Sequence, residues 1–288
     1  MEISEARWHV AGGYGMLAAD VIAALEARGV TPEVTDKEDL DITDASEVAR
    51  GFADTDIVVN CAAYTAVDAA ETDEERAYAI NATGPDVIAR ACAEMGIRLV
   101  HISTDYVFAG DATSPYPEDA PLEPRSAYGR TKAAGERAVL ASGADALILR
   151  IAWLYGRGGA CFPKTIARVG RETGKLRVVD DQVGQPTWTR DVADLILRLV
   201  EREVPAGIYH GTSSGQTSWY EFAREIVSSD GQGDIVSPSK SSETKRPAPR
   251  PAYSVLGHEA LRRVGVAPIG DWRDRWRVAA PEILADVG

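Results

Sequence analysis

The sequence predicts an α/β fold built on a doubly wound parallel sheet. Short apolar runs rich in β-branched residues alternate with helical patterns through the first half of the chain. These runs are apolar throughout instead of alternating with polar residues, which is typical of strands buried on both faces of a sheet. A glycine-rich turn at residues 12–15 joins the first run to the first helical pattern. Together the three observations indicate strands and helices that alternate along one layered domain.

The elements follow in order from the N-terminus. Residues 8–11 form the first expected strand, and residues 16–28 the first helix, whose apolar side chains share one face and which Gly29 ends. The same alternation predicts further strands at 30–35, 56–61, 98–103 and 145–151. It predicts further helices at 46–52, 72–96 and 126–142, the second of them interrupted at Gly84-Pro85.

Length and charge limit the classes of protein. The chain has 288 residues and a net charge of −13, from 31 Lys and Arg against 44 Asp and Glu, so it lacks the basic surface of a nucleic-acid binder. No apolar run is long enough to span a membrane, and the first residues do not resemble a signal peptide. The three cysteines form no CxxC pair, and the four histidines have no metal-ligand spacing. We therefore expect a cytoplasmic protein without nucleic-acid, membrane or metal partners, acting as a monomer or homodimer.

The pattern loosens after about residue 155, where Gly, Pro and Trp become more frequent. We expect residues 1–155 to form the nucleotide-binding layer. Residues 156–288 are expected to form mainly a smaller substrate-binding region, and a return of the chain into the first layer stays open.

The turn after the first strand has the pattern G-x-x-G-x-x-A, beginning at Gly12 and Gly15. Glycine lets the backbone turn tightly, so that its N–H groups and those of the following helix approach a pyrophosphate. This position between a strand and a helix predicts a Rossmann-type site for a nicotinamide dinucleotide, with Met16 and Leu17 at the start of the helix.

Two neighbouring residues give opposite indications about the cofactor. Asp36 lies about 20 residues after the glycine turn, where an acid binds the adenosine ribose of NAD. Lys37 follows it, and a cation there favours the 2′-phosphate of NADP. The sequence therefore leaves NADPH and NADH both open. Asp41 and Ile42 are expected near the adenine.

Tyr128 and Lys132 form a Y-x-x-x-K pattern within an expected helix. Residues four apart lie on the same helix face, so the ammonium is expected to lower the pKa of the phenol. Such a pair can protonate a carbonyl that accepts hydride. Thr104 follows the strand at 98–103 and can donate a hydrogen bond from its hydroxyl to the oxygen of that carbonyl. Residues 60–68 follow the preceding strand with small side chains where a cofactor passes.

At this point the chain resembles the extended short-chain dehydrogenases/reductases, and within them the dTDP-4-dehydrorhamnose reductase family. The resemblance covers nearly the whole chain. It rests on residues 59–68, 103–108, 128–132, 135–136, 150–156, 180–187, 189–191, 207–210, 218–223 and 246–254.

The resemblance implies transfer of hydride from NADPH or NADH to the C4 keto group of a dTDP-4-keto-6-deoxyhexose, which would give dTDP-L-rhamnose. It implies that Tyr128 donates the proton, Lys132 supports it and Thr104 holds the substrate. It places Asp105 and Trp153 at the sugar. The cofactor contacts it implies are Gly15, Met16, Leu17, Asp41, Ile42, Ala63, Tyr64 and Thr65. The glycine turn and the small residues after the third strand add Gly12 and Ala62 to the expected cofactor contacts.

The segment at 237–251 is rich in Pro, Ser and basic residues. By itself it fits a solvated loop. An acidic protein that binds a diphosphate needs a locally basic site, so we also consider Arg246 and Arg250 as ligands of the substrate diphosphate. Trp188 and Trp219 are expected in the core.

Two other functions stay open. A 4-ketoreductase for a different dTDP-deoxysugar would differ in few residues. A non-catalytic nucleotide-binding regulatory subunit is less compatible, because Thr104, Tyr128 and Lys132 are all present. Dehydration is disfavoured because Tyr106 occupies the place of the Glu that handles the elimination proton in dehydratases of this fold.

Overall fold

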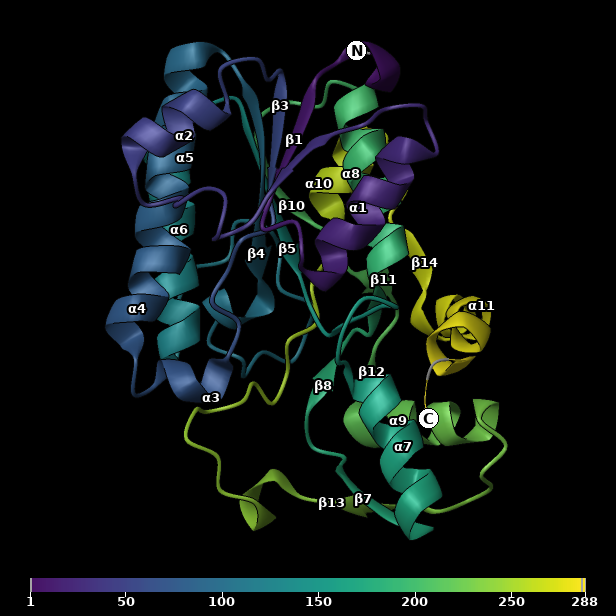
Figure 1. The fold of residues 1–288 in the computed structure, drawn as a ribbon. Coiled ribbons are helices and arrows are strands. Elements are labelled where there is room, and N and C mark those ends of the chain that lie inside the picture. Colours follow the sequence, from purple (N-terminus) through teal and green to yellow (C-terminus); the bar gives the residue numbers. More distant parts are fainter. Residues whose placement is uncertain (1, 286, 288) are drawn as a thin grey trace.

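The computed structural model describes residues 2–285 and 287, and its centre is a six-stranded sheet (Figure 1). The strands are β1 (Trp8–Ala11), β2 (Glu33–Thr35), β3 (Ile57–Asn60), β4 (Arg98–Thr104), β5 (Ala146–Ile151) and β10 (Gly207–His210). Their order is β10-β5-β4-β3-β1-β2, and every neighbouring pair is parallel. The chain thus extends from β1 in both directions, which confirms the doubly wound class and places ligands at the carboxyl ends of β1 and β3.

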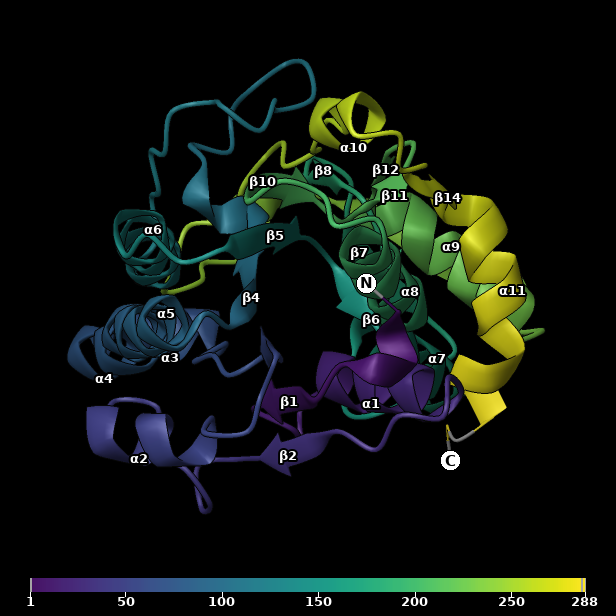
Figure 2. The same cartoon turned by 90° about the horizontal axis from the view of Figure 1, so that it is seen from above.

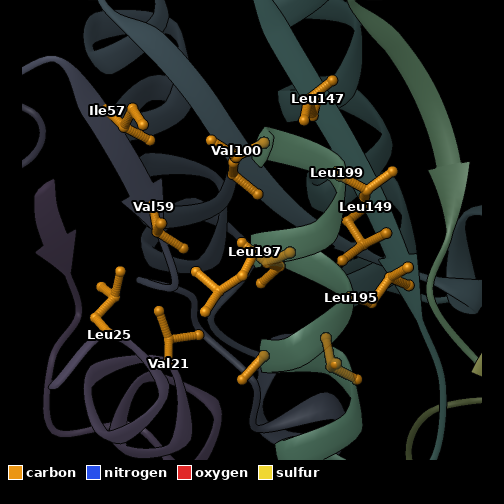
Figure 3. Close-up of a cluster of buried hydrophobic side chains, with 14 of the residues drawn as sticks. Val21, Leu25, Ile57, Val59, Val100, Leu147, Leu149, Leu195, Leu197 and Leu199 are labelled. Carbon is orange, nitrogen blue, oxygen red and sulfur yellow. The ribbon is translucent and has the colours of Figure 1, made fainter. Parts of the chain in front are cut away.

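Helices cover both faces of this sheet (Figure 2). One face carries α1 (Met16–Glu26) and α8 (Thr189–Glu201), and the other carries α2 (Ala45–Gly51), α5 (Gly84–Met95) and α6 (Ala127–Ala141). Successive strand residues point to opposite faces. Val59 accordingly packs with leucines of α8 (Figure 3), while Val58 packs with the α5 layer. Burial on both faces explains why the strands read as continuous apolar runs.

The expected helix at 72–96 is a succession of three helical segments. They are α4 (Glu74–Tyr78), a π-helical turn (Ala79–Thr83) and α5. Gly84-Pro85 does not break the chain direction, because Thr83 and Gly84 keep helical dihedral angles and Pro85 lies in the first turn of α5, directly after the π-helical turn. A Cβ on Gly84 would lie 2.5 Å from the Ile42 side chain, so glycine is needed for close packing.

The second strand is shorter than the expected 30–35. β2 begins at Glu33, because Pro32 has no N–H to donate to β1. The N–H of Val30 instead donates to the Leu25 carbonyl at 3.0 Å, closing the end of α1.

The remaining elements form a smaller region below the sheet in Figure 1, together with connections at its edges. Its helices α7 (Phe162–Thr173), α9 (Trp219–Ser229) and α11 (Trp272–Ala285) enclose a second core around Trp276. Two elements beyond residue 155, α8 and β10, belong to the sheet layer. The other elements are α3 (Val67–Ala70), α10 (Glu259–Arg263), β6 (Leu154–Tyr155), β7 (Leu176–Val179), β8 (Val183–Gly184), β9 (Thr187–Trp188), β11 (Ser213–Ser214), β12 (Thr217–Ser218), β13 (Val236–Ser239) and β14 (Ile269–Asp271). Within the described residues, no helix has the length and apolar character of a membrane span.

Candidate active site

The sheet and α6 bring Thr104, Tyr128 and Lys132 to one cavity. Thr104 is the last residue of β4, and Tyr128 and Lys132 lie on successive turns of α6. Helix α6 begins where the Ser126 hydroxyl accepts a hydrogen bond from the Gly129 N–H at 3.1 Å. A Cβ on Gly129 would lie 2.2 Å from the Tyr106 carbonyl oxygen. Glycine at this position therefore lets the first turn of α6 approach the backbone that follows β4.

Burial dominates the protonation of Tyr128. It raises the pKa of the phenol to about 12, although a hydrogen bond with the Thr104 side chain acts in the opposite direction. The sequence led us to expect a lowered pKa from Lys132, and the net shift in the structure is opposite because desolvation of the phenolate outweighs the favourable contacts. Tyr128 is therefore a neutral phenol at pH 7, with a proton to give.

Lys132 is buried next to this phenol. Its Nζ donates a hydrogen bond to the Ile102 carbonyl at 2.6 Å. Burial lowers the pKa of Lys132 to about 8, and the carboxylate of Glu136, one turn further along α6, raises it in part. The ammonium thus keeps its charge at neutral pH with the help of a buried acid.

Glu136 belongs to a buried polar network under the site. Its carboxylate accepts the Ser103 hydroxyl at 2.5 Å and two bonds from the Arg150 guanidinium, at 2.9 and 2.7 Å. Arg150 also donates to the Glu118 carbonyl at 2.9 Å. The network joins β4 and α6, the two elements that carry the catalytic candidates, to β5. Its two charged members matched family motifs in the sequence, but nothing in their spacing marked them as a buried pair.

The catalytic candidates line a cavity of about 630 Å³ with the glycine turn. Burial raises the pKa of Asp105, which also lines it, to about 6. The other expected site residues that line this cavity are Gly15, Met16, Leu17, Ala63, Thr65 and Trp153. Tyr64 is not among them, since its backbone N–H donates to Asn81 Oδ1 at 2.8 Å and its side chain packs against the buried cluster of Ala70, Ala77 and Ala127.

A second cavity of about 410 Å³ continues from the first past Gly15, Cys61 and Ala63. The expected residues that line it are Gly12, Asp36, Lys37, Asp41, Ile42 and Ala62. One Asp36 oxygen accepts the backbone N–H of Tyr14 at 3.0 Å, so this carboxylate also braces the glycine turn. Arg76 on α4 lines the cavity as well. Sequence reasoning missed it, because it lies on a helix beyond the motif at residues 60–68 and belongs to no pattern that indicates nucleotide binding.

The glycine turn fits a dinucleotide. Gly12 has φ +76°, and a Cβ there would lie 2.5 Å from the backbone nitrogen of Ala62. Gly15 precedes α1 and offers no side chain to cap its first amides, which leaves the positive end of the helix for an anion. These residues would hold a pyrophosphate between the two cavities, with the nicotinamide beside Tyr128 and Lys132.

A third cavity of about 660 Å³ shares Tyr106 and Trp153 with the first. Arg246 and Arg250 line it, as does Trp219. The indoles of Trp153 and Trp219 are stacked, with ring centroids 3.5 Å apart and planes inclined by 6°. Trp153 has φ +48°, a strained conformation for a bulky residue and one that accumulates at functional sites. Trp219, expected in the core, therefore also forms part of the cavity wall, while Trp188 is buried.

Comparison with known proteins places the chain among reductases of nucleotide sugars. The family model of the RmlD substrate binding domain matches residues 7–285. A probable dTDP-4,6-dihydroxy-2-methyloxan-3-one 4-ketoreductase from Streptomyces antibioticus is 46% identical, covering 97% of this chain and 96% of the relative. A dTDP-4-dehydrorhamnose reductase from Streptomyces griseus is 42% identical, covering 98% and 95%.

A solved structure shares the fold along its whole length. It is a dTDP-4-dehydrorhamnose reductase from Bacillus anthracis in complex with NADP, with a TM-score of 0.92 and 36% identity. The match covers 96% of this chain and 99% of that one. The chain belongs to the RmlD substrate binding domain family, the family of the dTDP-4-dehydrorhamnose reductases.

Proposed function

We propose that the protein reduces the C4 keto group of dTDP-4-dehydro-L-rhamnose to give dTDP-L-rhamnose. The observation that carries this proposal is the meeting of Thr104, Tyr128 and Lys132 in a cavity that joins the dinucleotide turn to the basic cavity of Arg246 and Arg250. A ketone carbon in that cavity would face a proton donor on one side and a hydride source on the other.

Tyr128, Thr104 and Lys132 each have a separate role in the reduction. A bound reduced nicotinamide supplies the hydride to C4. Tyr128, kept neutral by burial, donates its proton to the carbonyl oxygen as that oxygen becomes an alkoxide. Thr104 orients the same oxygen through its hydroxyl. Lys132 stabilises the phenolate that Tyr128 leaves behind, since its ammonium is held in the same cavity by the Ile102 carbonyl.

The remaining expected residues bind the two substrates. Asp105 and Trp153 line the first cavity, beside the expected position of the sugar. Arg246 and Arg250 line the third cavity and suit the diphosphate, because a guanidinium can donate two parallel hydrogen bonds to phosphate oxygens. The second cavity, where the adenosine of the cofactor would lie, is lined by both Asp36 and Lys37, together with Arg76. We therefore propose that NADPH and NADH both bind.

A second candidate is reduction of another dTDP-4-keto-6-deoxysugar. The Streptomyces antibioticus relative, named a probable 4-ketoreductase for such a sugar, is 46% identical, against 42% for the Streptomyces griseus dTDP-4-dehydrorhamnose reductase. In either case we propose that the enzyme acts in the cytoplasm as a monomer or homodimer, consistent with its three free cysteines and its net charge of −13.

The test compares ketosugars and a catalytic variant. Oxidation of NADPH and of NADH is followed by absorbance with dTDP-4-dehydro-L-rhamnose and, separately, with dTDP-4-dehydro-6-deoxy-D-glucose. Higher kcat/KM with the first substrate and dTDP-L-rhamnose as product support the proposal, and the reverse preference supports the second candidate. Tyr128→Phe is expected to lose about 100-fold or more in kcat while still binding cofactor. Undiminished turnover in that variant would refute the role of Tyr128, and no turnover with any ketosugar would favour a regulatory protein.

A further inference from the structure

The segment that carries the two arginines crosses to the nucleotide-binding layer. We call residues 244–252 the strap. In Figure 1 the chain leaves β13 in the smaller region and passes close to α3 before it returns toward the sheet. The strap ends where the Val183 N–H donates to the Ala252 carbonyl at 2.9 Å and the Tyr253 N–H donates to the Gly110 carbonyl at 2.9 Å.

Asp68 on α3 is the point at which the strap meets the nucleotide-binding layer. Its Oδ1 accepts the backbone N–H of Ala248 at 3.2 Å. Its Oδ2 lies 2.9 Å from Nη2 of Arg250 and 3.4 Å from Nη1 of Arg246. Arg250 in turn donates to the Ala248 carbonyl at 3.0 Å. One carboxylate thus holds both guanidinium groups and the backbone between them.

These contacts leave the arginines able to bind an anion. A guanidinium carries five N–H groups, and Asp68 contacts one nitrogen of each arginine. The charged side chains that line the third cavity are Arg177, Arg246 and Arg250, all of them positive and so opposite in sign to a nucleoside diphosphate. Both arginines line the third cavity, whereas Asp68 is not among its lining residues.

Asp68 is also a close neighbour in sequence of residues that line the first cavity. Thr65, on the loop between β3 and α3, and Val67, the first residue of α3, line the first cavity. The Asp68 contacts therefore connect the segment at residues 65–68 directly to the strap. Through these contacts the carboxylate links the segment that lines the first cavity to the strap that lines the third cavity.

We propose that Asp68 is a positioning residue for the nucleoside diphosphate of the substrate, acting by holding the strap so that Arg246 and Arg250 face the third cavity. This inference rests on the proposed function and adds to it a residue that does not itself touch the substrate. It makes a counterintuitive prediction. Removing a negative charge beside an anion site strengthens anion binding when charge alone acts, whereas loss of positioning weakens it.

The experiment measures binding of dTDP by titration calorimetry, which needs no turnover. The variants are Asp68→Asn, which keeps an acceptor for the Ala248 N–H, and Asp68→Ala, which does not. We expect the Kd for dTDP to rise roughly tenfold in Asp68→Asn and further in Asp68→Ala. Misplacing the two guanidinium groups costs more binding free energy than a screened surface ion pair contributes. Asp194→Asn, which removes the same charge from an exposed pair with Arg198, is expected to leave Kd unchanged.

Three further readouts make the result specific. The KM for the ketosugar should rise with Kd, while the KM for the cofactor and kcat stay within about twofold. In a double-mutant cycle with Arg246→Ala, the losses should not add, because Asp68 acts through that arginine. Equal or tighter dTDP binding in both Asp68 variants would overturn the inference. Failure of the parent enzyme to bind dTDP would instead overturn the proposed function.

Discussion

Glu136 offers a sharp test of how the site is supported. Its carboxylate pairs with the Arg150 guanidinium, and both side chains are almost fully buried, with exposed fractions of 0% and 1%. Replacing Glu136 with Gln removes the charge with little change of shape and leaves the guanidinium without its counter-charge. Removing one partner of a buried ion pair costs about 3–5 kcal/mol of unfolding free energy.

Thermal unfolding followed by circular dichroism measures this loss. At about 2 °C per kcal/mol, the low end for chains of 150–250 residues, the expected fall in Tm is roughly 6–10 °C. Glu74→Gln is the matched control, since Glu74 pairs with Arg130 at 2.7 Å and both side chains are 44% exposed. Exposed pairs contribute about 0–1 kcal/mol, so Tm should fall by about 2 °C at most. Similar shifts in the two variants would refute the reasoning.

The same variant reports on Lys132. Burial lowers the pKa of this lysine to about 8, and the Glu136 carboxylate opposes the shift. His101 and Cys61 also face the ammonium, and burial keeps both neutral, with a lowered pKa for His101 and a raised pKa for Cys61. The fall of kcat/KM on the alkaline side should therefore move to lower pH in Glu136→Gln. An unmoved pH profile would show that Glu136 does not maintain the charge of Lys132.

Three other predictions test the cavities. Gly12→Ala should weaken NADPH binding in a fluorescence titration at least tenfold, since its Cβ would lie 2.5 Å from the Ala62 nitrogen; unchanged binding would contradict the assigned turn. Trp219→Ala should raise KM for the ketosugar severalfold and leave KM for the cofactor unchanged, because the stack with Trp153 is lost; a rise in both constants would count against it. Burial raises the pKa of Asp105 from 3.8 to about 6, so the native state binds more protons than the unfolded state between these values and the unfolding free energy falls as pH rises through them. Asp105→Asn should therefore gain about 2 kcal/mol more over the parent at pH 7 than at pH 4 in urea unfolding, and an equal gain at both pH values would refute the assignment.

Most of the sheet was predictable from local pattern. Strands such as Ile57–Asn60 and Ala146–Ile151 are buried on both faces, so their apolar runs are unambiguous. The boundaries differed where backbone chemistry decides, as at Pro32, which delays β2, and at Gly84, whose missing Cβ admits Ile42. The packing at Gly84 depends on a neighbouring element and has no signature in its own segment, whereas Pro32 is visible in the sequence and could have shortened the predicted strand.

The site was predictable where a motif carries chemistry and less so where packing does. Tyr128, Lys132 and Thr104 stood out by residue type and spacing. The direction of the Tyr128 pKa shift did not, because desolvation depends on everything that surrounds the phenol. Trp219 illustrates the same point, since an indole at helical spacing looks like a core residue until the indole that it stacks on is known. Arg76 lines the second cavity from a helix that carries no nucleotide-binding motif.

The return of the chain into the sheet has a consequence for biosynthesis. When a ribosome has released only the first 155 residues, β5 still has an open edge, because its partner β10 comes from residues 207–210. The face that α8 covers is also bare, with Leu147 and Leu149 unprotected. Closing this core requires pairing across some 60 residues of intervening chain, which slows folding and exposes the nascent sheet to aggregation. The first layer thus matures only after much of the second region has been made, so the order of synthesis and the order of folding differ.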